Sequence, residues 1–513
     1  MRLGRFLLLS VLLLAAVVSF AEADAQRPRK PSRQIRKMVK YLRTLERNYV
    51  EDIDLTPYIE GSIEEITSQL DPFSHYMSAE EYEQHQSRFT RRIAGIGAEF
   101  VVVRDSVVVL RVVEDSPAQI SGLQPLDRIV AIDSRNIVGV DNTSIIAAIQ
   151  GEPSSLVTLS VVRPSDGSVH ELSLHRAVIP QRSIPVYYRA AEGVGYLKLS
   201  SFTYNTSADF DAALQELGDV HTLVLDLCDN GGGLIAPAID VAGHFLKKNS
   251  VVCSLKSNSR TRHYRTKGAT FDGRVIVMVN GGSASASEVV AAALQDWDRG
   301  VVVGRITFGK GVGQHTFHYD DGSALHLTTM KVLSPSGRSI QRPYELGASE
   351  EYFFGMLPRM SNNRHSEVDT LPLPKFFTLN SSRTVYGNSG VHPDIFVKTP
   401  LGSLLGVFCD VVLVDLLDKY RTTIVSRYPR CSDFIADFSF DASDIALFGG
   451  DDAEENERWG ELLKMRMAFN IYPAEQYYPI YNLMLNDIYR EALAVANSPQ
   501  MVFLFYSGFS REW

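Results

Sequence analysis

The chain has 513 residues, of which 45% are hydrophobic and 22% are charged, and its formal net charge is -9 at pH 7. These proportions are ordinary for a soluble globular chain, and the length is enough for about three domains. The acidic balance argues against a nucleic-acid-binding protein.

The first 25 residues have the pattern of a secretory signal. Arg2 and Arg5 precede an apolar stretch over residues 6–20, and Ala23-Asp24-Ala25 fits an A-x-A cleavage site. The apolar stretch is short for a membrane span, although a retained anchor is the alternative. We therefore expect an exported protein, with the periplasm as its compartment.

A helical region is expected next, over residues 26–90. Residues 26–33 form a basic linker that contains proline, and residues 34–89 predict helices around the turn signal at Leu70-Asp71-Pro72-Phe73-Ser74.

Residues 91–177 predict a small β-fold. Short apolar runs indicate strands at residues 100–103, 107–110, 129–132 and 157–161, and residues 142–150 predict one helix. The first strand follows the glycine loop Gly95-Ile96-Gly97-Ala98. Such a loop can hold a peptide carboxylate in a backbone nest while the peptide extends the strand.

Residues 178–400 predict an α/β core, because strand and helix patterns alternate. Strands are expected at residues 194–199, 222–227 and 274–280, and helices at residues 208–217, 236–246 and 289–297.

A glycine-rich segment, Asp226-Leu227-Cys228-Asp229-Asn230-Gly231-Gly232-Gly233, directly follows one buried strand. Its glycines would let backbone N–H groups face a ligand, as an oxyanion hole requires, and a plain turn is the alternative. We expect Gly232 and Ala286 to donate one N–H each to the same tetrahedral oxygen.

The serine run Gly281-Gly282-Ser283-Ala284-Ser285-Ala286-Ser287-Glu288 lies between a strand and a helix. Ser285 is therefore expected at a helix N-terminus, where free N–H groups and the helix dipole favour a developing negative charge. Ser285-x-x-Glu288 is also a capping box, so helix capping without chemistry is the alternative.

Lys310 lies between Gly309 and Gly311, after the apolar strand signal at residues 301–304. A lysine acts as a general base only when neutral, and lowering its pKa from about 10.4 to roughly 7 to 8 costs on the order of 4 kcal/mol, which favours a functional site. Gln314 is an uncharged group that can orient the amine. Ser285, Lys310 and Gln314 are thus the expected nucleophile, base and orienting group.

Other catalytic motifs fit less well. Residues 304–310 match the first part of a phosphate-binding P-loop, but Gly311 replaces the Ser or Thr that would hold magnesium, and the sequence after it predicts a hairpin. No H-E-x-x-H zinc motif is present. His315 and His318 are the candidates for a Ser-His-Asp triad, with a structural role as the favoured interpretation.

Residues 401–513 predict helices, with amphipathic runs near 404–421, 457–467 and 481–496 that would suit a homodimer or an adaptor surface. The acidic run at residues 451–457 is expected to be a solvated loop, since its spacing fits no EF-hand. The four cysteines, Cys228, Cys253, Cys409 and Cys431, form no C-x-x-C pair. Disulfides Cys228–Cys253 or Cys409–Cys431 are alternatives to buried free thiols.

From about Tyr49 to Asp394 the chain resembles the carboxy-terminal processing peptidases, also called tail-specific proteases. The shared motifs are the LDPxS turn at residues 70–74, a PDZ-like order of motifs from the glycine loop at 95–100 to Ile132-Asp133, the segment at 226–233, the SASASE run at 283–288, Leu294-Gln295-Asp296, Phe308-Gly309-Lys310-Gly311 and the PSGRSIQ segment at 335–341.

The resemblance implies an α+β multidomain protein. It implies a PDZ domain at residues 91–177 and an α/β serine protease core of the ClpP/crotonase-like kind at residues 178–400, and the sequence patterns described above add the flanking helical regions. It also implies a serine endopeptidase that binds C-terminal tails with apolar last residues at Gly95, Ile96, Gly97 and Ala98. The roles of Ser285, Lys310, Gln314, Gly232 and Ala286 follow as stated above, Asp296 is expected to be structural, and no metal or organic cofactor is expected.

Two positions depart from this family pattern. Cys228 stands where the family usually has arginine, and Leu126 stands where it usually has glycine. These departures motivate a second interpretation, an inactive PDZ scaffold that holds tails without cutting them.

Overall fold

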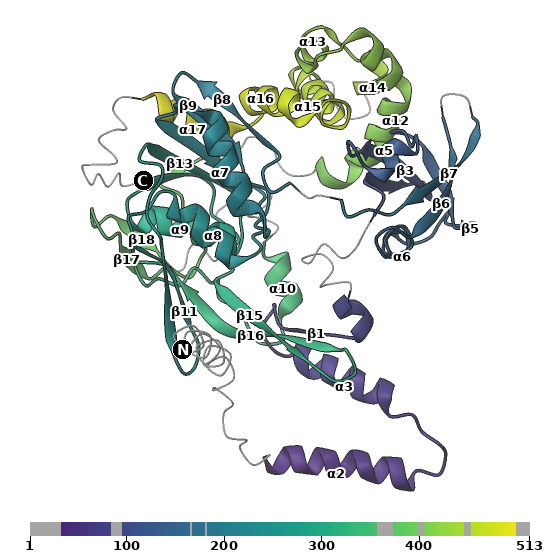
Figure 1. Ribbon diagram of the computed structural model, residues 1–513, viewed down its shortest axis with the longest axis vertical. Coiled ribbons are helices and arrows are strands. Elements are labelled where there is room, and N and C mark those ends of the chain that lie inside the picture. The colour runs from purple at the N-terminus through teal and green to yellow at the C-terminus, as the bar shows by residue number, and fades with distance from the viewer. Residues whose placement is uncertain are drawn as a thin grey trace, which may run out of the picture. The chain divides into compact units, whose positions relative to one another are not determined.

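The computed structural model describes residues 32–83, 95–164, 167–179, 182–356, 373–398, 405–445 and 453–498 (Figure 1). The predicted secretory signal lies outside these residues. The chain divides into two compact units, Met1–Ile66 and Thr67–Trp513. Within the described residues, no helix has the length and apolar character needed to cross a membrane.

The first unit contains helices, as predicted. Helix α2 spans Arg33–Asn48, and its N-terminus is capped by Ser32, whose side chain accepts a hydrogen bond from the Ile35 N–H. Helix α3 spans Thr56–Ser68 and ends just before the Leu70–Ser74 turn.

The second unit contains the predicted β-fold. Its sheet has the order β2-β3-β4-β6-β7, with β5 paired to β4 and all pairs antiparallel. The elements are β2 Ala98–Val103, β3 Ser106–Val112, α5 Pro117–Ile120, β4 Arg128–Ile132, β5 Arg135–Asn136, α6 Asn142–Ile149, β6 Leu156–Val162 and β7 Val169–His175. The four predicted strands and the helix are confirmed. Strand β7 was not predicted, because polar residues dominate its sequence.

The two faces of this sheet pack against different parts of the molecule. Val107 and Val109 of β3 belong to the core of the β-fold itself. Val108, on the opposite face, belongs to a cluster with Leu413 and Leu417 from the C-terminal region. Successive residues of a strand point to opposite faces, so one strand serves both cores.

The predicted α/β core is built on a second sheet, of order β19-β14-β13-β10-β9-β8, in which only β8 is antiparallel to its neighbour. Its strands are β8 Val186–Ala191, β9 Val194–Lys198, β10 Thr222–Asp226, β13 Arg274–Val279, β14 Gly300–Gly304 and β19 Ile395–Phe396. Helices α7 Thr206–Leu217, α8 Ile235–Gly243 and α9 Ala286–Asp296 cover one face (Figure 1). A parallel sheet covered on both faces explains the apolar strand sequences.

A third sheet has the order β1-β16-β11-β12, with β15 paired to β16. Its strands are β1 His75–Met77, β11 Val251–Lys256, β12 Thr261–Arg265, β15 Val312–His318 and β16 Ala324–Leu333, and the remaining elements nearby are α10 Ser349–Phe354, β17 Lys375–Phe377 and β18 Thr384–Tyr386. The hairpin β15–β16 confirms the expectation that excluded a P-loop, which needs a helix there. Strand β1 lies in a region predicted as helical.

The C-terminal region is helical, as predicted, with α12 Leu405–Arg427, α13 Cys431–Asp437, α14 Ala442–Ile445, α15 Ala453–Ile471, α16 Ala474–Met484 and α17 Asp487–Asn497. Helix α17 covers the second face of the core sheet through Ile488 and Tyr489. The amphipathic run expected near residues 481–496 is helical, and it is divided between the end of α16 and α17. The Asn486 side chain caps α17 by accepting from the Tyr489 N–H, and this divides the run.

Two further expectations for the C-terminal half need correction. The acidic run at residues 451–457 is not entirely a loop, because α15 begins at Ala453. Cys228, Cys253 and Cys431 are free and buried, so neither proposed disulfide forms and the buried-thiol interpretation holds for these three. The side chain of Cys409 lies outside the described residues.

Candidate active site

Ser285 lies at the turn between β13 and α9, as predicted. The helix begins at Ala286, three residues earlier than expected, so Ser285 is its N-cap residue. Its φ of 55° is in the left-handed region, which side chains other than glycine rarely adopt. Strained conformations of this kind cluster at functional sites.

Glu288 joins the serine turn to the loop that carries Lys310. This buried carboxylate accepts hydrogen bonds from the N–H of Ser285 at 2.9 Å, the N–H of Gly309 at 2.7 Å and the N–H of Lys310 at 2.8 Å. The Thr307 hydroxyl donates a fourth at 2.5 Å. Burial raises the pKa of Glu288, and these four donors oppose the rise. The carboxylate thus caps the helix and also fixes the distance between the two loops.

Lys310 lies in a partly apolar setting. Its Nζ is 4.8 Å from the centroid of the Phe73 ring. Burial lowers the pKa of Lys310, against the charges of Glu288 and Asp71, which raise it. Among the described residues, no hydrogen bond joins Lys310 Nζ to Ser285 Oγ. Burial therefore favours the neutral form of the Lys310 amine, which a lysine base requires, and Nζ lies over the Phe73 ring.

The turn at residues 70–74 places Phe73 beside the lysine. Asp71 accepts hydrogen bonds from the Phe73 N–H at 3.0 Å, the Ser74 hydroxyl at 2.6 Å and the Thr328 hydroxyl at 2.7 Å. The Ser74 hydroxyl in turn accepts from the Thr328 N–H at 2.9 Å. Sequence reasoning found this motif only as a turn and missed its contact with the base, although an aromatic residue inside a polar turn was a signal.

Gln314 reaches the same network. Its side-chain amide donates to the Thr328 hydroxyl at 3.0 Å, and that hydroxyl donates onward to Asp71. Gln314 is thus connected to the turn beneath Lys310, while its direct orientation of the amine stays a prediction. Thr328, the residue between them, was not predicted as part of the site.

Gly232 approaches the serine turn closely, as predicted. Its φ is 102°, and a Cβ at this position would lie 2.8 Å from Ser285 Cβ and 2.9 Å from the Ala286 nitrogen. Only glycine fits there. The Gly232 N–H donates to Asn230 Oδ1 at 2.9 Å. The structure brings the two expected oxyanion donors together, and their role stays a prediction.

Asn230 holds the glycine loop against the serine turn. Its buried amide donates to the Leu199 carbonyl at 2.8 Å. The backbone carbonyl of Asn230 accepts hydrogen bonds from the Ala284 N–H at 3.0 Å and from the Ser287 hydroxyl at 2.8 Å. Sequence reasoning singled out the glycines and passed over this side chain, which fixes their position.

The two histidine candidates lie on β15 with exposed side chains. The His315 ring packs against Phe317 with centroids 4.9 Å apart, and the His318 ring packs against Tyr82 at 5.0 Å. In the part of the chain that the structure describes, neither is hydrogen-bonded to Ser285. The structural interpretation of both residues fits this placement.

The predicted peptide loop of the β-fold precedes an edge strand. Gly95 pairs with Ala177 through two backbone hydrogen bonds of 3.0 Å, and Ile96 is buried. Gly97 has φ 79°, and a Cβ there would lie 2.2 Å from Ser116 Cβ. Ala98 opens β2, which ends the strand order of its sheet, so its outer edge has no described strand partner. An added peptide strand fits this edge.

Comparison with known proteins matches the chain to a peptidase family and to PDZ domains. A model of peptidase family S41 matches residues 193–347, and a PDZ domain model matches residues 94–175. The carboxy-terminal processing protease CtpB of Bacillus subtilis is 31% identical over 335 residues, which cover 64% of this chain and 69% of that protein. The chain belongs to peptidase family S41. It is a serine peptidase with a PDZ domain, related to the carboxy-terminal processing proteases.

The chain is also similar to two further proteases. A carboxy-terminal-processing protease of Bartonella bacilliformis is 33% identical over 302 residues, which cover 57% of this chain and 69% of that protein. Among solved structures, the photosystem II D1 C-terminal processing protease matches at 23% identity with a TM-score of 0.38, over 72% of this chain and 94% of that one.

Hydrogen bonds of its backbone fix Cys228, the first departure from the family pattern. Its N–H donates to Asp226 Oδ1 at 2.8 Å, and its carbonyl accepts from Lys198 Nζ at 3.1 Å. Lys198 and Asp226 form a buried ion pair at 3.3 Å. Burial raises the pKa of the Cys228 thiol, so the side chain is neutral. The Lys198–Asp226 pair therefore anchors the start of the glycine loop without a charge at position 228.

Leu126, the second departure, contacts the C-terminal helices. Its φ is 76°, and its N–H donates to the Val109 carbonyl at 2.6 Å. Its buried side chain lies in the cluster that includes Leu413 and Leu417 of α12. Ion pairs Arg104–Asp415 at 2.7 Å and Arg128–Asp418 at 2.9 Å flank this contact. The strained leucine thus adds apolar area where the PDZ sheet meets the C-terminal region.

The contacts of Asp296 fit the structural role expected of it. It forms an ion pair at 2.9 Å with Arg338, and both side chains are fully buried. Its second oxygen accepts from the Ser336 N–H at 2.9 Å. The pair fastens the segment 335–341 to the end of α9.

Proposed function

We propose that this S41 peptidase is an exported, periplasmic serine endopeptidase that binds C-terminal tails on its PDZ domain and cleaves peptide bonds through a Ser285–Lys310 acyl-enzyme mechanism. The observation that carries the proposal is the Glu288 carboxylate, which holds the Ser285 turn and the Lys310 loop at once. A helix cap alone would not require contacts to the second loop.

In the proposed first step, neutral Lys310 takes the proton of Ser285 as its Oγ attacks the scissile carbonyl carbon. The carbonyl oxygen becomes an oxyanion, stabilised by the N–H groups of Gly232 and Ala286. The C–N bond then breaks, and the Lys310 ammonium gives its proton to the leaving amine. Water, deprotonated by Lys310, hydrolyses the ester and restores Ser285.

This chemistry requires two local adjustments on substrate binding. Lys310 Nζ has to leave the face of Phe73, and the Gly232 N–H has to exchange Asn230 Oδ1 for the oxyanion. Catalytic hydrogen bonds often tighten only once substrate is bound, so both changes are within the range expected of a free enzyme.

For recognition, we propose that the tail extends β2 as an added antiparallel strand. Its carboxylate would lie at the backbone of Gly95, Ile96, Gly97 and Ala98, and its last side chain would face the apolar residues of the PDZ core. This arrangement fits tails that end in an apolar residue. An adaptor and a homodimer formed by the C-terminal helices stay predictions; α12 already buries part of its apolar surface against the PDZ sheet.

Cleavage of an unstructured peptide with an apolar C-terminus tests the proposal. Ser285→Ala and Lys310→Ala should each abolish cleavage while thermal unfolding stays close to wild type. Ser283→Ala is the matched control, because the Ser283 hydroxyl donates to the buried Leu227 carbonyl and has no role in the reaction. It should keep cleavage and lose about 1 kcal/mol of unfolding free energy. Full cleavage by either Ser285→Ala or Lys310→Ala would contradict the mechanism.

The alternative is a PDZ scaffold that binds tails without cutting them. The observation that fits it is the hydrogen bond from the Gly232 N–H to Asn230 Oδ1, since a donor that kept this bond when substrate is bound would give no oxyanion hole. Tail binding by wild type, with no cleavage product over many hours, would establish this alternative.

A further inference from the structure

Helix α2 has one basic face and one apolar face. Its basic residues are Arg33, Arg36, Lys37, Lys40, Arg43 and Arg47, and Glu46 is its single acidic residue. Its apolar residues are Ile35, Met38, Val39, Leu42 and Leu45. At 3.6 residues per turn the two sets fall on opposite sides of the helix.

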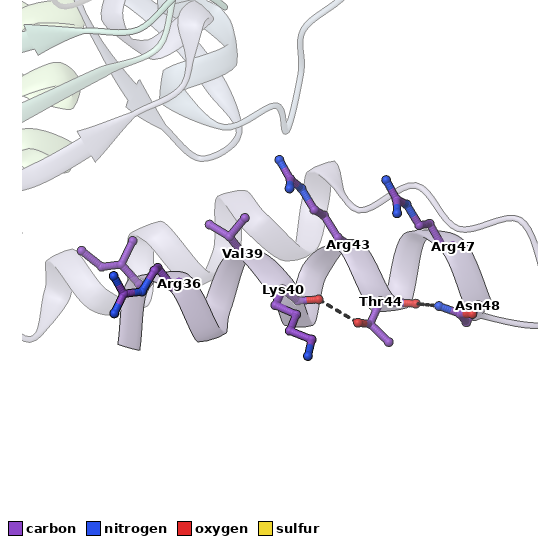
Figure 2. Close-up of a pocket in the computed structure, with 8 residues that line it drawn as sticks. Arg36, Val39, Lys40, Arg43, Thr44, Arg47 and Asn48 are labelled. Carbon is purple, nitrogen blue, oxygen red and sulfur yellow. Dashed lines mark hydrogen bonds between the residues drawn. The ribbon is translucent and has the colours of Figure 1, made fainter. Parts of the chain in front are cut away.

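Neither face is buried in the described structure, and of the apolar residues only Leu42 and Leu45 are half-buried. No residue of α2 is buried, and the side chains of Ile35, Met38 and Val39 are 56%, 45% and 44% exposed. Arg43 and Arg47 extend from the same side of the helix, along a surface hollow lined by α2 itself (Figure 2). A helix whose only role was packing inside the protein would bury its apolar residues.

We propose that α2 docks on an anionic lipid bilayer, parallel to its surface. The basic side chains would lie among the phosphate headgroups, while Ile35, Met38 and Leu42 would enter the acyl boundary. A strongly amphipathic helix with lysine and arginine on its polar face binds membranes in this way. The helix is also too short and too charged to span a bilayer.

Charge decides between a bilayer and a second copy of this helix. Two copies packed through their apolar faces would direct the six basic residues of each copy away from the contact, with only one acidic residue in each copy to offset them, so a second copy would account for the apolar face alone. An anionic lipid surface complements the same residues, and each lysine or arginine near it contributes about 1 kcal/mol. The whole chain carries -9, so the attraction belongs to this segment and not to the protein at large.

Vesicle sedimentation tests the proposal on the chain from Gln26 onward, the product of the expected signal cleavage. We expect binding to vesicles that contain 30 mol% phosphatidylglycerol, little binding to pure phosphatidylcholine vesicles, and loss of binding at high salt. Arg36→Gln with Arg43→Gln should weaken partitioning roughly 25-fold, about five-fold per charge. Met38→Asp should also weaken it. The matched control is Lys247→Gln with Lys248→Gln, two exposed lysines outside α2, and should bind as wild type does.

Equal binding to neutral and anionic vesicles, or unchanged binding by the Arg36/Arg43 variant, would overturn the proposal. So would a fall in oligomer size caused by Met38→Asp with no change in vesicle binding, which would identify a second copy as the occupant. Cleavage of a tail peptide in solution should be the same in all these variants. The membrane proposal can therefore fail while the proposed peptidase mechanism stands, and the reverse also holds.

Discussion

The Glu288 carboxylate accepts the backbone N–H of Lys310 at 2.8 Å, so the helix that starts after Ser285 and the loop that carries the base are fixed to one buried side chain. Glu288→Gln would replace one of its two acceptor oxygens by a donor that faces other donors. We expect cleavage to fall by about 100-fold or more and the unfolding free energy by about 2 to 3 kcal/mol. Peptide kinetics and chemical denaturation measure the two effects.

The control for this variant is Glu216→Gln. Among the described contacts, the Glu216 carboxylate accepts one hydrogen bond, from the Tyr187 hydroxyl at the surface. Glu216→Gln should therefore leave cleavage unchanged. Wild-type cleavage by Glu288→Gln would show that the carboxylate is only a helix cap.

The pH profile of cleavage should report Lys310. Burial lowers the pKa of Lys310, and the neutral base forms as pH rises, so kcat/KM should increase with pH through an apparent pKa below the ordinary value of about 10.4. Below the lowered pKa both the folded and the unfolded chain carry the proton, and burial of the charged amine destabilises the fold. Between the lowered pKa and about 10.4 the folded protein binds fewer protons at this site than the unfolded chain, so stability increases with pH across this window.

Asp71→Asn should move the rising limb of this profile to lower pH, because the Asp71 charge raises the pKa of Lys310. The variant keeps the oxygen that accepts from both the Thr328 hydroxyl and the Phe73 N–H, and it replaces the oxygen that accepts from the Ser74 hydroxyl. A limb that stays in place or moves to higher pH would show that Asp71 does not act on the base electrostatically.

Phe73→Ala should raise the pKa of Lys310 by letting water reach its amine. The Lys310 Nζ lies 4.8 Å from the ring centroid, so removal of the ring uncovers it directly. Each unit by which the pKa rises above the assay pH reduces the neutral fraction about ten-fold. Phe73→Leu keeps an apolar cover and should retain most activity at pH 7. Equal kinetics for the alanine and leucine variants would contradict a desolvating role.

Gly232→Ala should abolish cleavage, because its Cβ would lie 2.8 Å from Ser285 Cβ at a φ of 102°. Gly231→Ala is the matched control, since a Cβ at that neighbouring position meets no atom within 4 Å. We expect at least a 100-fold difference in kcat/KM between the two variants. Similar activity in both would remove the close approach of this loop from the mechanism.

Leu126→Gly should loosen the contact between the PDZ sheet and the C-terminal helices. Glycine relieves a left-handed φ, which is favourable by about 1 kcal/mol, but removes a buried leucine side chain, which costs about 2 to 5 kcal/mol. The net result should be faster amide hydrogen exchange in α12 and β3. Unchanged exchange would mean that Leu126 contributes little to this interface.

The sequence predicted the α/β core well because its strands are continuous apolar runs that are buried on both faces. The Ser285 turn was predicted for the same reason, since strand and helix patterns meet there. The Phe73–Lys310 contact was not predicted. It depends on β1, which follows Phe73, is three residues long and pairs with β16 about 250 positions away. No local periodicity encodes such a pairing.

Hydrogen-bond partners were the least predictable part of the site. Gln314 donates to Thr328, and this partner follows from the register of β15 against β16, which contains a bulge between Gly313 and Gln314. A register is set by the assembled sheet. In the sequence, Leu126 was only a departure from the glycine usual in the PDZ turn. Its packing against α12 depends on the tertiary structure and could not be predicted from the sequence.

Reaction with a fluorophosphonate followed by peptide mass mapping is the most direct test of the central claim that Lys310 activates Ser285. We predict one adduct, on Ser285, in the wild type, no adduct in Ser285→Ala, and at least 100-fold slower labelling in Lys310→Ala. An adduct on any other serine, or wild-type labelling rates in Lys310→Ala, would contradict the claim.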